Sequence, residues 1–295
     1  MSLKILVTGA NGQLGADCIK VLYEHHLTSS FSHETLDITD PENVRMVLDA
    51  VKPDVIINCA AYTRVDDCET NIELAYKINS KGPANLARNA HQLGAKLIHI
   101  STDYVFDGTL EVPKGYVETD HTHPISIYGK SKYEGEQAVM TETDRFIIIR
   151  TAWLFGIGGH NFLKTIYRLA VSPDNKSPLK VIHTQYGSFT HTLHLAKQIK
   201  QMIELDVQGI YHATGEGYCT WYDGASYFLK AMGIQKEIMS CTEKEFPTQA
   251  VRPRNSILDN YRLKADQINM MPHWQESIDS FVTLFKEECL KNGQH

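Results

Sequence analysis

The sequence predicts an α/β fold, namely a Rossmann-type, doubly wound parallel sheet with a smaller C-terminal lobe. Three observations lead to this prediction. Short apolar runs typical of buried strands alternate with helical patterns, a glycine-rich turn follows the first run, and the alternation loosens after Arg150. Such alternation is typical of a parallel sheet covered by helices. The expected strands span residues 3–8, 27–31, 55–58, 96–100 and 146–150.

Bulk composition limits the classes of partner. The chain has 295 residues, 42% of them hydrophobic, and a formal net charge of −6. This length supports one large domain or two closely joined ones, and the absence of a dense Lys/Arg block argues against a nucleic-acid partner. The six cysteines show no Cys-x-x-Cys pair and no zinc-ligand spacing, so we expect reduced thiols and no metal. Without signal-peptide anatomy or an apolar run near the roughly 20 residues that span a bilayer, we expect a cytoplasmic protein with no membrane contact.

The turn at residues 9–15 predicts a dinucleotide site. It follows the first strand and opens the first helix. Glycine permits left-handed dihedrals, close approach of the backbone to a pyrophosphate and tight packing of helix on strand, while the helix N-terminus binds phosphate oxygens. An ordinary strand-to-helix turn is the alternative, but the position favours cofactor binding. The predicted cofactor-binding residues here are Gly9, Asn11, Gly12, Gln13, Leu14 and Gly15.

The end of the second strand predicts which dinucleotide binds. Ser32 and His33 lie where NAD-selective folds usually place an acidic residue, which would repel a 2′-phosphate. Both side chains can donate a hydrogen bond, so we expect NADPH as the cofactor and leave NADH open as a second one. Asp37, followed by Ile38, either faces the adenine or caps the helix that begins at Pro41.

Small residues follow the third strand. Ala60, Ala61 and the adjacent Tyr62 would let a cofactor lie against the backbone. Residues 71–93 then read as a helix that Gly82-Pro83 should bend, since proline removes a backbone donor. Asn79 in this helix is expected to support the active edge of the sheet.

The fourth strand leads to the predicted catalytic residues. It delivers Thr102 and Asp103 at its carboxyl end, where ligands gather in open parallel sheets. Tyr128 and Lys132 begin the next helix, expected over residues 129–140, and their spacing places both side chains on one face. A neighbouring cation should lower the pKa of the phenol and make Tyr128 a general acid. A chance Tyr and Lys pair on a solvated helix is the alternative, which this context disfavours.

The later part of the chain predicts how the domains divide. Residues 181–185 and 209–213 read as strands on either side of a helix over 193–203, and we expect both strands to return to the sheet. The dinucleotide-binding domain would then comprise residues 1–150 with 181–213, and the substrate-binding lobe 151–180 and 214–295.

A long loop over residues 106–127 has little periodicity. Loops of this length are often lids or binding segments. Its residues Asp120, His121 and His123 suggest a metal site, but a solvated polar loop is the better interpretation.

Nearly the whole chain resembles the extended short-chain dehydrogenase/reductases, and within them the dTDP-4-dehydrorhamnose reductase family. The most specific segment is Ser-Thr-Asp-Tyr-Val-Phe-Asp-Gly at residues 101–108. In the related sugar-nucleotide dehydratases a catalytic Glu follows the Thr-Asp pair, whereas Tyr104 stands here, which favours a plain reductase. The other matching segments lie at residues 9–15, 58–69, 128–136, 150–156, 185–187, 220–222 and 252–259.

The resemblance implies a reaction and roles for individual residues. The reaction is hydride transfer from NADPH to the C4 carbonyl of a dTDP-linked 6-deoxy-4-ketohexose, with dTDP-4-dehydrorhamnose converted to dTDP-L-rhamnose for cell-surface polysaccharide. Lys132 would hold the nicotinamide ribose, and Thr102 with Asp103 would bond the sugar oxygen. Val65 and Trp153 match positions that pack the sugar.

Two departures leave alternatives open. The family's Asp-Gln-x-Gly-x-Pro-Thr run keeps Gln185, a predicted substrate contact, but has Thr184 for the acid and Phe189 for the proline. The change is structural, or marks a different nucleotide-linked keto sugar, or marks a non-catalytic NADP-binding regulatory subunit. Arg252 would pair with the substrate diphosphate or form a surface ion pair. A homodimer stays open as an assembly.

Overall fold

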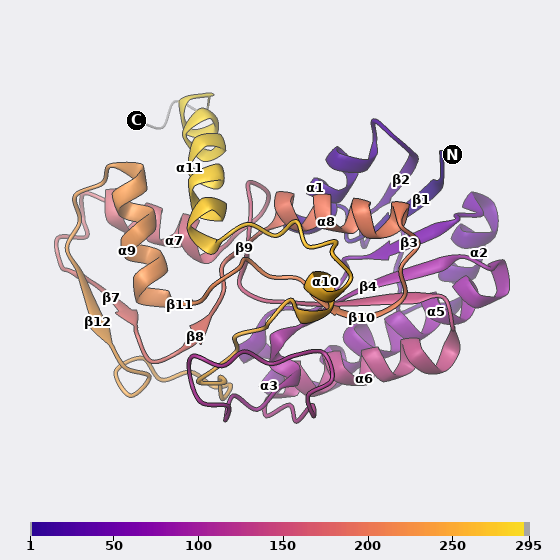
Figure 1. Cartoon of the computed structure of the whole chain (residues 1–295), viewed down its shortest axis with the longest axis horizontal. Coiled ribbons are helices and arrows are strands. Elements are labelled where there is room, and N and C mark those ends of the chain that lie inside the picture. The colour runs from indigo at the N-terminus through magenta and orange to yellow at the C-terminus, as the bar shows by residue number, and fades with distance from the viewer. Residues whose placement is uncertain (1, 292–295) are drawn as a thin grey trace.

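In the computed structural model, which describes residues 2–291, a parallel sheet of six strands forms the centre of the larger part of the molecule (Figure 1). The strand order is β10-β5-β4-β3-β1-β2, and every neighbouring pair is parallel. The strands are β1 (Lys4–Thr8), β2 (Leu27–Phe31), β3 (Val55–Asn58), β4 (Lys96–Thr102), β5 (Phe146–Thr151) and β10 (Gly209–His212). The doubly wound parallel sheet is therefore confirmed, and its strand order reverses between β1 and β3.

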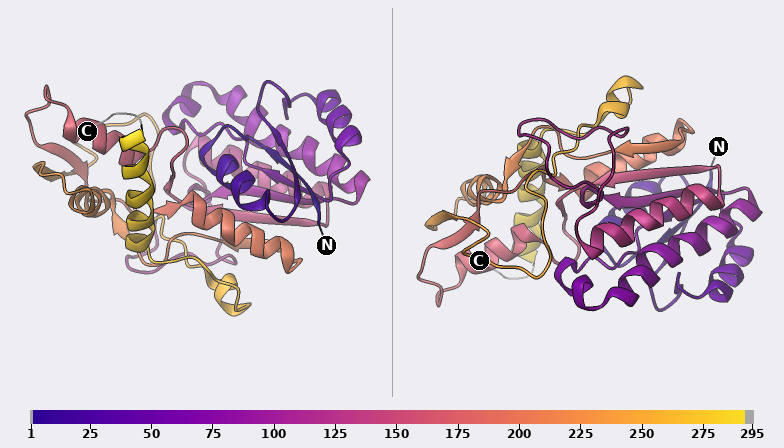
Figure 2. Two further views of the ribbon diagram at one scale, coloured as in Figure 1. Left: turned by 90° about the horizontal axis from the view of Figure 1, so that it is seen from above. Right: turned by 90° about the horizontal axis from the view of Figure 1, so that it is seen from below.

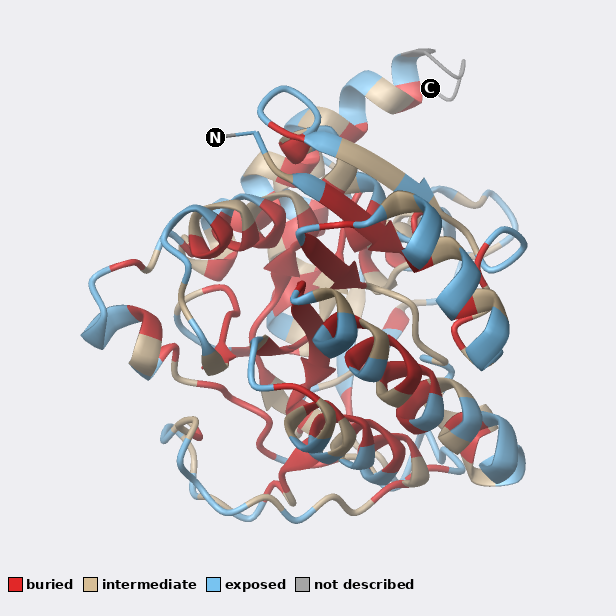
Figure 3. Ribbon diagram, turned by 90° about the vertical axis from the view of Figure 1, so that its right-hand side faces the viewer, coloured by how far each residue is buried: buried red, intermediate tan, exposed pale blue. Residues whose placement is uncertain are grey.

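Helices cover both faces of this sheet (Figures 1 and 2). One face carries α1 (Gln13–Leu22) packed against α8 (Thr192–Glu204), and the other carries α2 (Pro41–Val51), α5 (Gly82–Leu93) and α6 (Ile127–Glu142). Because both faces are covered, β3 and β4 are buried along their whole length, as Figure 3 shows for the central strands.

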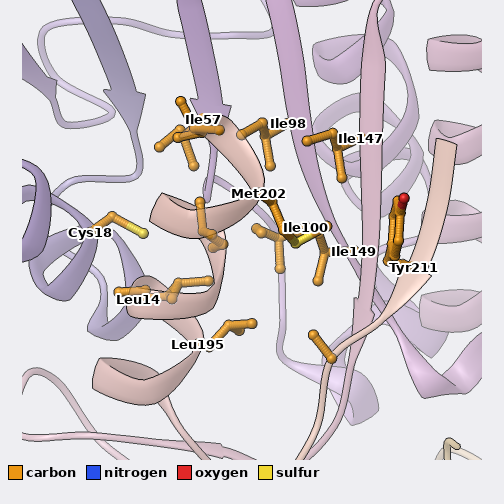
Figure 4. Close-up of a cluster of buried hydrophobic side chains, with 14 of the residues drawn as sticks. Leu14, Cys18, Ile57, Ile98, Ile100, Ile147, Ile149, Leu195, Met202 and Tyr211 are labelled. Carbon is orange, nitrogen blue, oxygen red and sulfur yellow. The ribbon is translucent and has the colours of Figure 1, made fainter. Parts of the chain in front are cut away.

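A cluster of apolar side chains fills the space between the sheet and the α1–α8 pair (Figure 4). Leu14 and Cys18 of α1 meet Leu195 and Met202 of α8 over Ile57 of β3. Leu14 was predicted to bind the cofactor, but its side chain belongs to this core and is 5% exposed. Its place in the turn therefore leaves only the backbone to face a ligand.

The bend predicted within residues 71–93 takes the form of a π-helical turn. Helix α4 (Ile72–Tyr76) runs into the π turn Lys77–Lys81, which runs into α5. Pro83 has no N–H to donate to the carbonyl of Asn79, so the regular α-helical bond is missing there. That carbonyl lies instead against Gly135 of α6, where a side chain would collide with it.

The smaller C-terminal lobe lies beside the sheet (Figure 2). Its aromatic core includes Phe155, Phe189, Phe228 and Phe281. The helices are α7 (Phe162–Val171), α9 (Trp221–Met232) and α11 (Trp274–Lys291). The strand pairs are β6 (Leu154–Phe155) with β9 (Thr190–His191), β7 (Leu179–Ile182) with β12 (Ile238–Cys241), and β8 (Tyr186–Gly187) with β11 (Cys219–Thr220). The remaining helices are α3 (Val65–Thr70), α10 (Tyr261–Ala265), which packs on β10, and the 3-10 turn Asp103–Val105.

One predicted strand was placed wrongly. Residues 209–212 do return to the sheet as β10, but the strand expected at 181–185 is β7, which ends at Ile182 and pairs with β12 in the lobe. The edge of β5 is already taken by β10. Leu179 and Val181 therefore face the aromatic core of the lobe instead of the sheet.

The long loop after β4 is anchored along its length. Tyr116 stacks on Phe106 with ring centroids 4.3 Å apart. The amide of Asn255 donates to the carbonyls of Leu110 and Lys114, both at 2.9 Å. The loop therefore packs on the segment around Asn255, which leads from β12 of the lobe to α10 beside the sheet.

Candidate active site

A groove of about 440 Å³ lies at the point where the strand order reverses. Such points are where ligands bind in doubly wound sheets. The predicted residues that line it are Gly9, Asn11, Gly12, Ser32, His33, Asp37, Ile38, Ala60 and Ala61. The sequence reasoning did not select Glu34, Leu36, Thr39, Cys59 or Ile78, which also line it. Gln13, Leu14, Gly15 and Tyr62 were predicted to join them and lie outside this lining.

The glycine turn leaves the backbone bare on the side of the groove. Gly9 has a φ of +63°, and a Cβ there would lie 2.7 Å from the backbone nitrogen of Ala60. Gly12 donates its N–H to the carbonyl of Gly9 at 2.9 Å, which closes the turn just before α1 begins at Gln13. The amides at the start of α1 are thereby exposed to an anion. The turn fits the pyrophosphate of a dinucleotide.

The end of β2 supplies the other end of the groove. His33 is 81% exposed, and its Nδ1 lies 3.9 Å from Oδ1 of Asp37. Asp37 does not cap the next helix, because Asp40 does so by accepting the N–H groups of Glu42 and Asn43. Burial raises the pKa of Asp37, but hydrogen bonds from Thr39 outweigh it and hold that pKa below its usual value. Of the two interpretations of Asp37, the structure removes the cap and leaves the adenine contact as a prediction.

Tyr128 is the second residue of α6, and its side chain is buried next to the carboxyl end of β4. Ser126 caps the helix by accepting the N–H of Gly129 at 3.1 Å. The hydroxyl of Thr102 donates to Oδ1 of Asp103 at 2.9 Å. Thr102 also lies near enough to the phenol of Tyr128 to act on its pKa. The structure therefore brings three of the four predicted catalytic residues together at the carboxyl end of β4.

Burial dominates the electrostatics of these groups. It raises the pKa of Asp103 to about 6, and within residues 2–291 its Oδ2 has no hydrogen-bond partner. Burial also raises the pKa of Tyr128, and the nearby hydroxyl of Thr102 only partly offsets this rise.

Lys132, the fourth predicted catalytic residue, lies one turn further along α6. Its ammonium donates to the carbonyl of Ile100 at 2.6 Å. Burial lowers the pKa of Lys132 to about 8, and the carboxylate of Glu136 opposes that shift. Lys132 is not among the main groups that act on the pKa of Tyr128 here, since its ammonium is directed to a carbonyl of β4, so the prediction that Lys132 lowers that pKa stays a prediction.

A buried ion pair beneath the catalytic residues was missed from the sequence. Arg150 of β5 donates to both carboxylate oxygens of Glu136, at 3.0, 3.3 and 2.7 Å. Ser101 donates to the same carboxylate at 2.5 Å. Glu136 lies four residues after Lys132, which puts both on the buried face of α6, and that spacing is the signal that would have found it. The pair ties α6 to the ends of β4 and β5.

Asn79 and Asn58 support the site from the other side. The Asn79 side chain accepts the N–H of Tyr62 at 2.8 Å and donates to its carbonyl at 3.0 Å, and it also donates to the hydroxyl of Ser131 at 3.1 Å. Asn58 accepts from the hydroxyl of Thr8 at 2.7 Å, which joins β1 to β3 below the glycine turn. Asn79 therefore ties Tyr62, which follows β3, to Ser131 of α6, and these bonds are the support expected from it.

Of the other predicted substrate residues, Trp153 belongs to the lobe, whereas Val65 belongs to α3. Trp153 has a φ of +46° and stacks on Trp221 with centroids 3.7 Å apart. Val65 opens α3 and packs beside Tyr128, while Gln185 is buried just before β8. Arg252 forms an ion pair with Asp66 at 2.8 Å, which is the second of its two interpretations, and contact with a diphosphate stays a prediction.

Phe189, which replaces the proline of the family run, is a core residue of the lobe. It is 1% exposed, and its ring meets Trp153 at 5.2 Å and Trp221 at 5.3 Å between centroids. Gly224 packs without a side chain against the same ring. These contacts favour the structural interpretation of Phe189, because its ring fills the core of the lobe.

Across residues 2–291, no group of three or more His, Cys, Asp and Glu side chains is arranged to hold a metal ion. In the same range, no helix is both long and apolar enough to cross a membrane.

Known proteins match this chain along nearly its whole length. The family model for the RmlD substrate binding domain matches residues 3–287. The chain is 36% identical to a spore coat polysaccharide biosynthesis protein of Bacillus subtilis strain 168, over 97% of this chain and 99% of that protein. The crystal structure of a dTDP-4-dehydrorhamnose reductase from Clostridium acetobutylicum is 41% identical with a TM-score of 0.92, over 96% of this chain and 100% of that one. That of the reductase from Bacillus anthracis, in complex with NADP, is 38% identical with a TM-score of 0.91, over 95% and 99% of the two chains.

Proposed function

This chain belongs to the RmlD substrate binding domain family, and on that premise we propose that it reduces dTDP-4-dehydrorhamnose to dTDP-L-rhamnose. It is an oxidoreductase of dTDP-sugar biosynthesis, and its cofactor is NADPH. What we propose is the keto sugar that it reduces. It is supported by the match of the whole chain, including the lobe that would hold the sugar, to reductases named for this substrate.

The single observation that carries the proposal is the placement of Tyr128 beside Thr102 and Asp103 at the carboxyl end of β4, where the hydroxyl of Thr102 donates to Asp103 at 2.9 Å. This edge of the sheet also bears the groove that fits the dinucleotide. A bound NADPH and the phenol of Tyr128 would therefore meet at the same edge of the sheet, as the reduction of a carbonyl requires.

Each residue then has a role in the reaction. NADPH, when bound, supplies the hydride to C4. Tyr128 gives its proton to the oxygen as negative charge develops there, which is worth roughly 100- to 10,000-fold in rate. Thr102 orients the phenol and the sugar oxygen. Lys132, beside the end of β4, holds the nicotinamide ribose.

The chain divides into a part that would bind the dinucleotide and a part that would bind the sugar. We assign residues 1–150 with 192–213 to the dinucleotide-binding domain, and 151–180 with 214–295 to the substrate-binding lobe. The position of β7 adds residues 181–191 to the lobe, because β7 and β9 both pair with strands of the lobe.

The test is turnover of candidate sugars by the pure protein with NADPH. Loss of NADPH absorbance with dTDP-4-dehydrorhamnose, and none with Tyr128→Phe, is the expected result. Turnover of a different nucleotide-linked keto sugar alone would overturn the substrate. Tight cofactor binding with no turnover of any keto sugar would instead favour the regulatory subunit.

A further inference from the structure

The first turns of α1 carry Gln13, whose side chain bonds to the segment after β6, and Asp17, whose side chain bonds to the start of α8. Gln13 donates through Nε2 to the carbonyl of His160 at 3.1 Å, and its Oε1 accepts from the amide of Asn161 at 3.0 Å. One turn later, Asp17 accepts from the hydroxyl of Thr192 at 2.5 Å. The dinucleotide turn and the segment after β6 are thus joined by specific polar contacts in addition to apolar packing.

Residues 156–161 pack against Gln13. A Cβ on Gly158 would lie 3.5 Å from Cα of Gln13, and one on Gly159, where φ is +61°, would lie 3.3 Å from its Cγ. Gly156 packs closely on the hydroxyl of Thr192. The segment therefore lies directly on the start of α1, and the absence of a side chain at Gly156 lets it pack closely on Thr192 of α8.

Asn161 connects the contact to α7. Its Oδ1 caps that helix by accepting the N–H of Lys164 at 3.0 Å, and its amide also donates to the carbonyl of Gly156 at 2.9 Å. Movement of the segment relative to Gln13 would therefore displace the start of α7, whose Phe162 packs on Trp221 at 4.7 Å between centroids. Trp221 in turn stacks on Trp153.

We propose that Gln13 is a positioning residue that couples binding of the cofactor pyrophosphate to the placement of residues 156–161 and α7 in the substrate lobe. This rests on the proposed function only for its cofactor. Gln13 is the first residue of α1, where the backbone amides meet the phosphates, while its side chain holds the segment. Fixing Gln13 through its backbone reduces the entropy lost when the segment is ordered, so NADP⁺ favours the ordered lobe and the lobe favours NADP⁺.

The test is amide hydrogen exchange of residues 156–166, with and without saturating NADP⁺, in the full chain. In the wild type we expect NADP⁺ to slow exchange roughly fivefold or more, the lower end of usual coupling. In Gln13→Ala the slowing should disappear at a NADP⁺ concentration that saturates that variant. Asn161→Asp, which keeps the helix cap but loses the amide donor, should give the same loss.

A matched control is Gln137→Ala, whose side chain is exposed on α6. It should retain the full effect of NADP⁺. A merely structural weakening would speed exchange equally in both states and leave the ratio unchanged, which would overturn the proposal. Equal slowing in wild type and Gln13→Ala, or no slowing in wild type with NADP⁺ bound, would overturn it as well.

A second measurement uses dTDP as the probe of the lobe. NADP⁺ should tighten dTDP binding to the wild type roughly fivefold or more, and this factor should approach one in Gln13→Ala. If dTDP does not bind while NADP⁺ still slows exchange, the substrate assignment fails and the coupling stands. If NADP⁺ does not bind at all, both fail.

Discussion

Replacement of Glu136 by glutamine should lower the free energy of unfolding by about 3–5 kcal/mol, because it leaves Arg150 as an uncompensated buried charge. Glu136 is fully buried, and the side chain of Arg150 is 3% exposed. The carboxylate accepts three contacts from the guanidinium and one from Ser101, and Nη1 of Arg150 already has no partner among residues 2–291. Glutamine keeps the shape but loses the charge that these donors face.

Helix α6 offers a matched control in the pair of Arg88 with Glu142. Glu142 meets its arginine at 2.5 Å, but the two side chains are 52% and 27% exposed. Glu142→Gln should therefore cost under about 1 kcal/mol. Urea titration of both variants measures the difference, provided that the slope with denaturant is unchanged. Equal losses in the two variants would refute the reasoning, as would a loss from Glu136→Gln within the range of the surface pair.

The same substitution should change the pH dependence of turnover. The Glu136 carboxylate raises the pKa of Lys132 against the larger effect of burial, which brings that pKa down to about 8. Without the carboxylate the pKa of Lys132 falls further, so the ammonium is lost at a lower pH. The alkaline limb of the kcat profile should therefore move to lower pH in Glu136→Gln and stay in place in Glu142→Gln. An unmoved limb would show that turnover does not depend on the charge of Lys132.

Three further predictions concern the site itself. Tyr128→Phe preserves the ring but removes the proton donor, so kcat should fall roughly 100- to 10,000-fold while the NADPH dissociation constant stays within a few-fold, and substantial residual turnover would sink the assignment. Lys132→Met should damage both turnover and NADPH binding, and unchanged NADPH binding would show that the ribose role is wrong. NADPH should bind more tightly than NADH, because Ser32 and His33 can donate hydrogen bonds to the 2′-phosphate and no acidic side chain stands in their place to repel it. A clear NADH preference in the measured dissociation constants would show that these two residues do not face the ribose.

Local patterns were sufficient for the elements whose form depends on their own residues. The bounds expected for β2 and β3 match the structure, and the glycine turn stands at the groove, because glycine spacing and apolar runs act locally. The position of β7 depends instead on which strand has a free edge, since β10 occupies the edge of β5. No local pattern in residues 181–185 carries that information.

In the candidate site, too, local patterns predict some features and tertiary contacts decide the others. The spacing of Tyr128 and Lys132 predicted a shared helical face, but the direction of the ammonium is set by the carbonyl of Ile100, which belongs to another element. The pairing of Glu136 with Arg150 is likewise fixed only when α6 lies across β5. Groups that act through tertiary neighbours stay hidden in a single sequence even when each residue type is visible.

The π-helical turn over Lys77–Lys81 has a consequence for how the chain tolerates a change of length. A π turn contains one residue more than an α-helical turn, so deletion of one residue there would restore a regular helix. The part before the turn would then rotate by about 100° relative to the part after it. Asn79 would lose Tyr62, or Ala75 would leave its buried position. The number of residues in this turn is therefore as important to the site as the identity of Asn79.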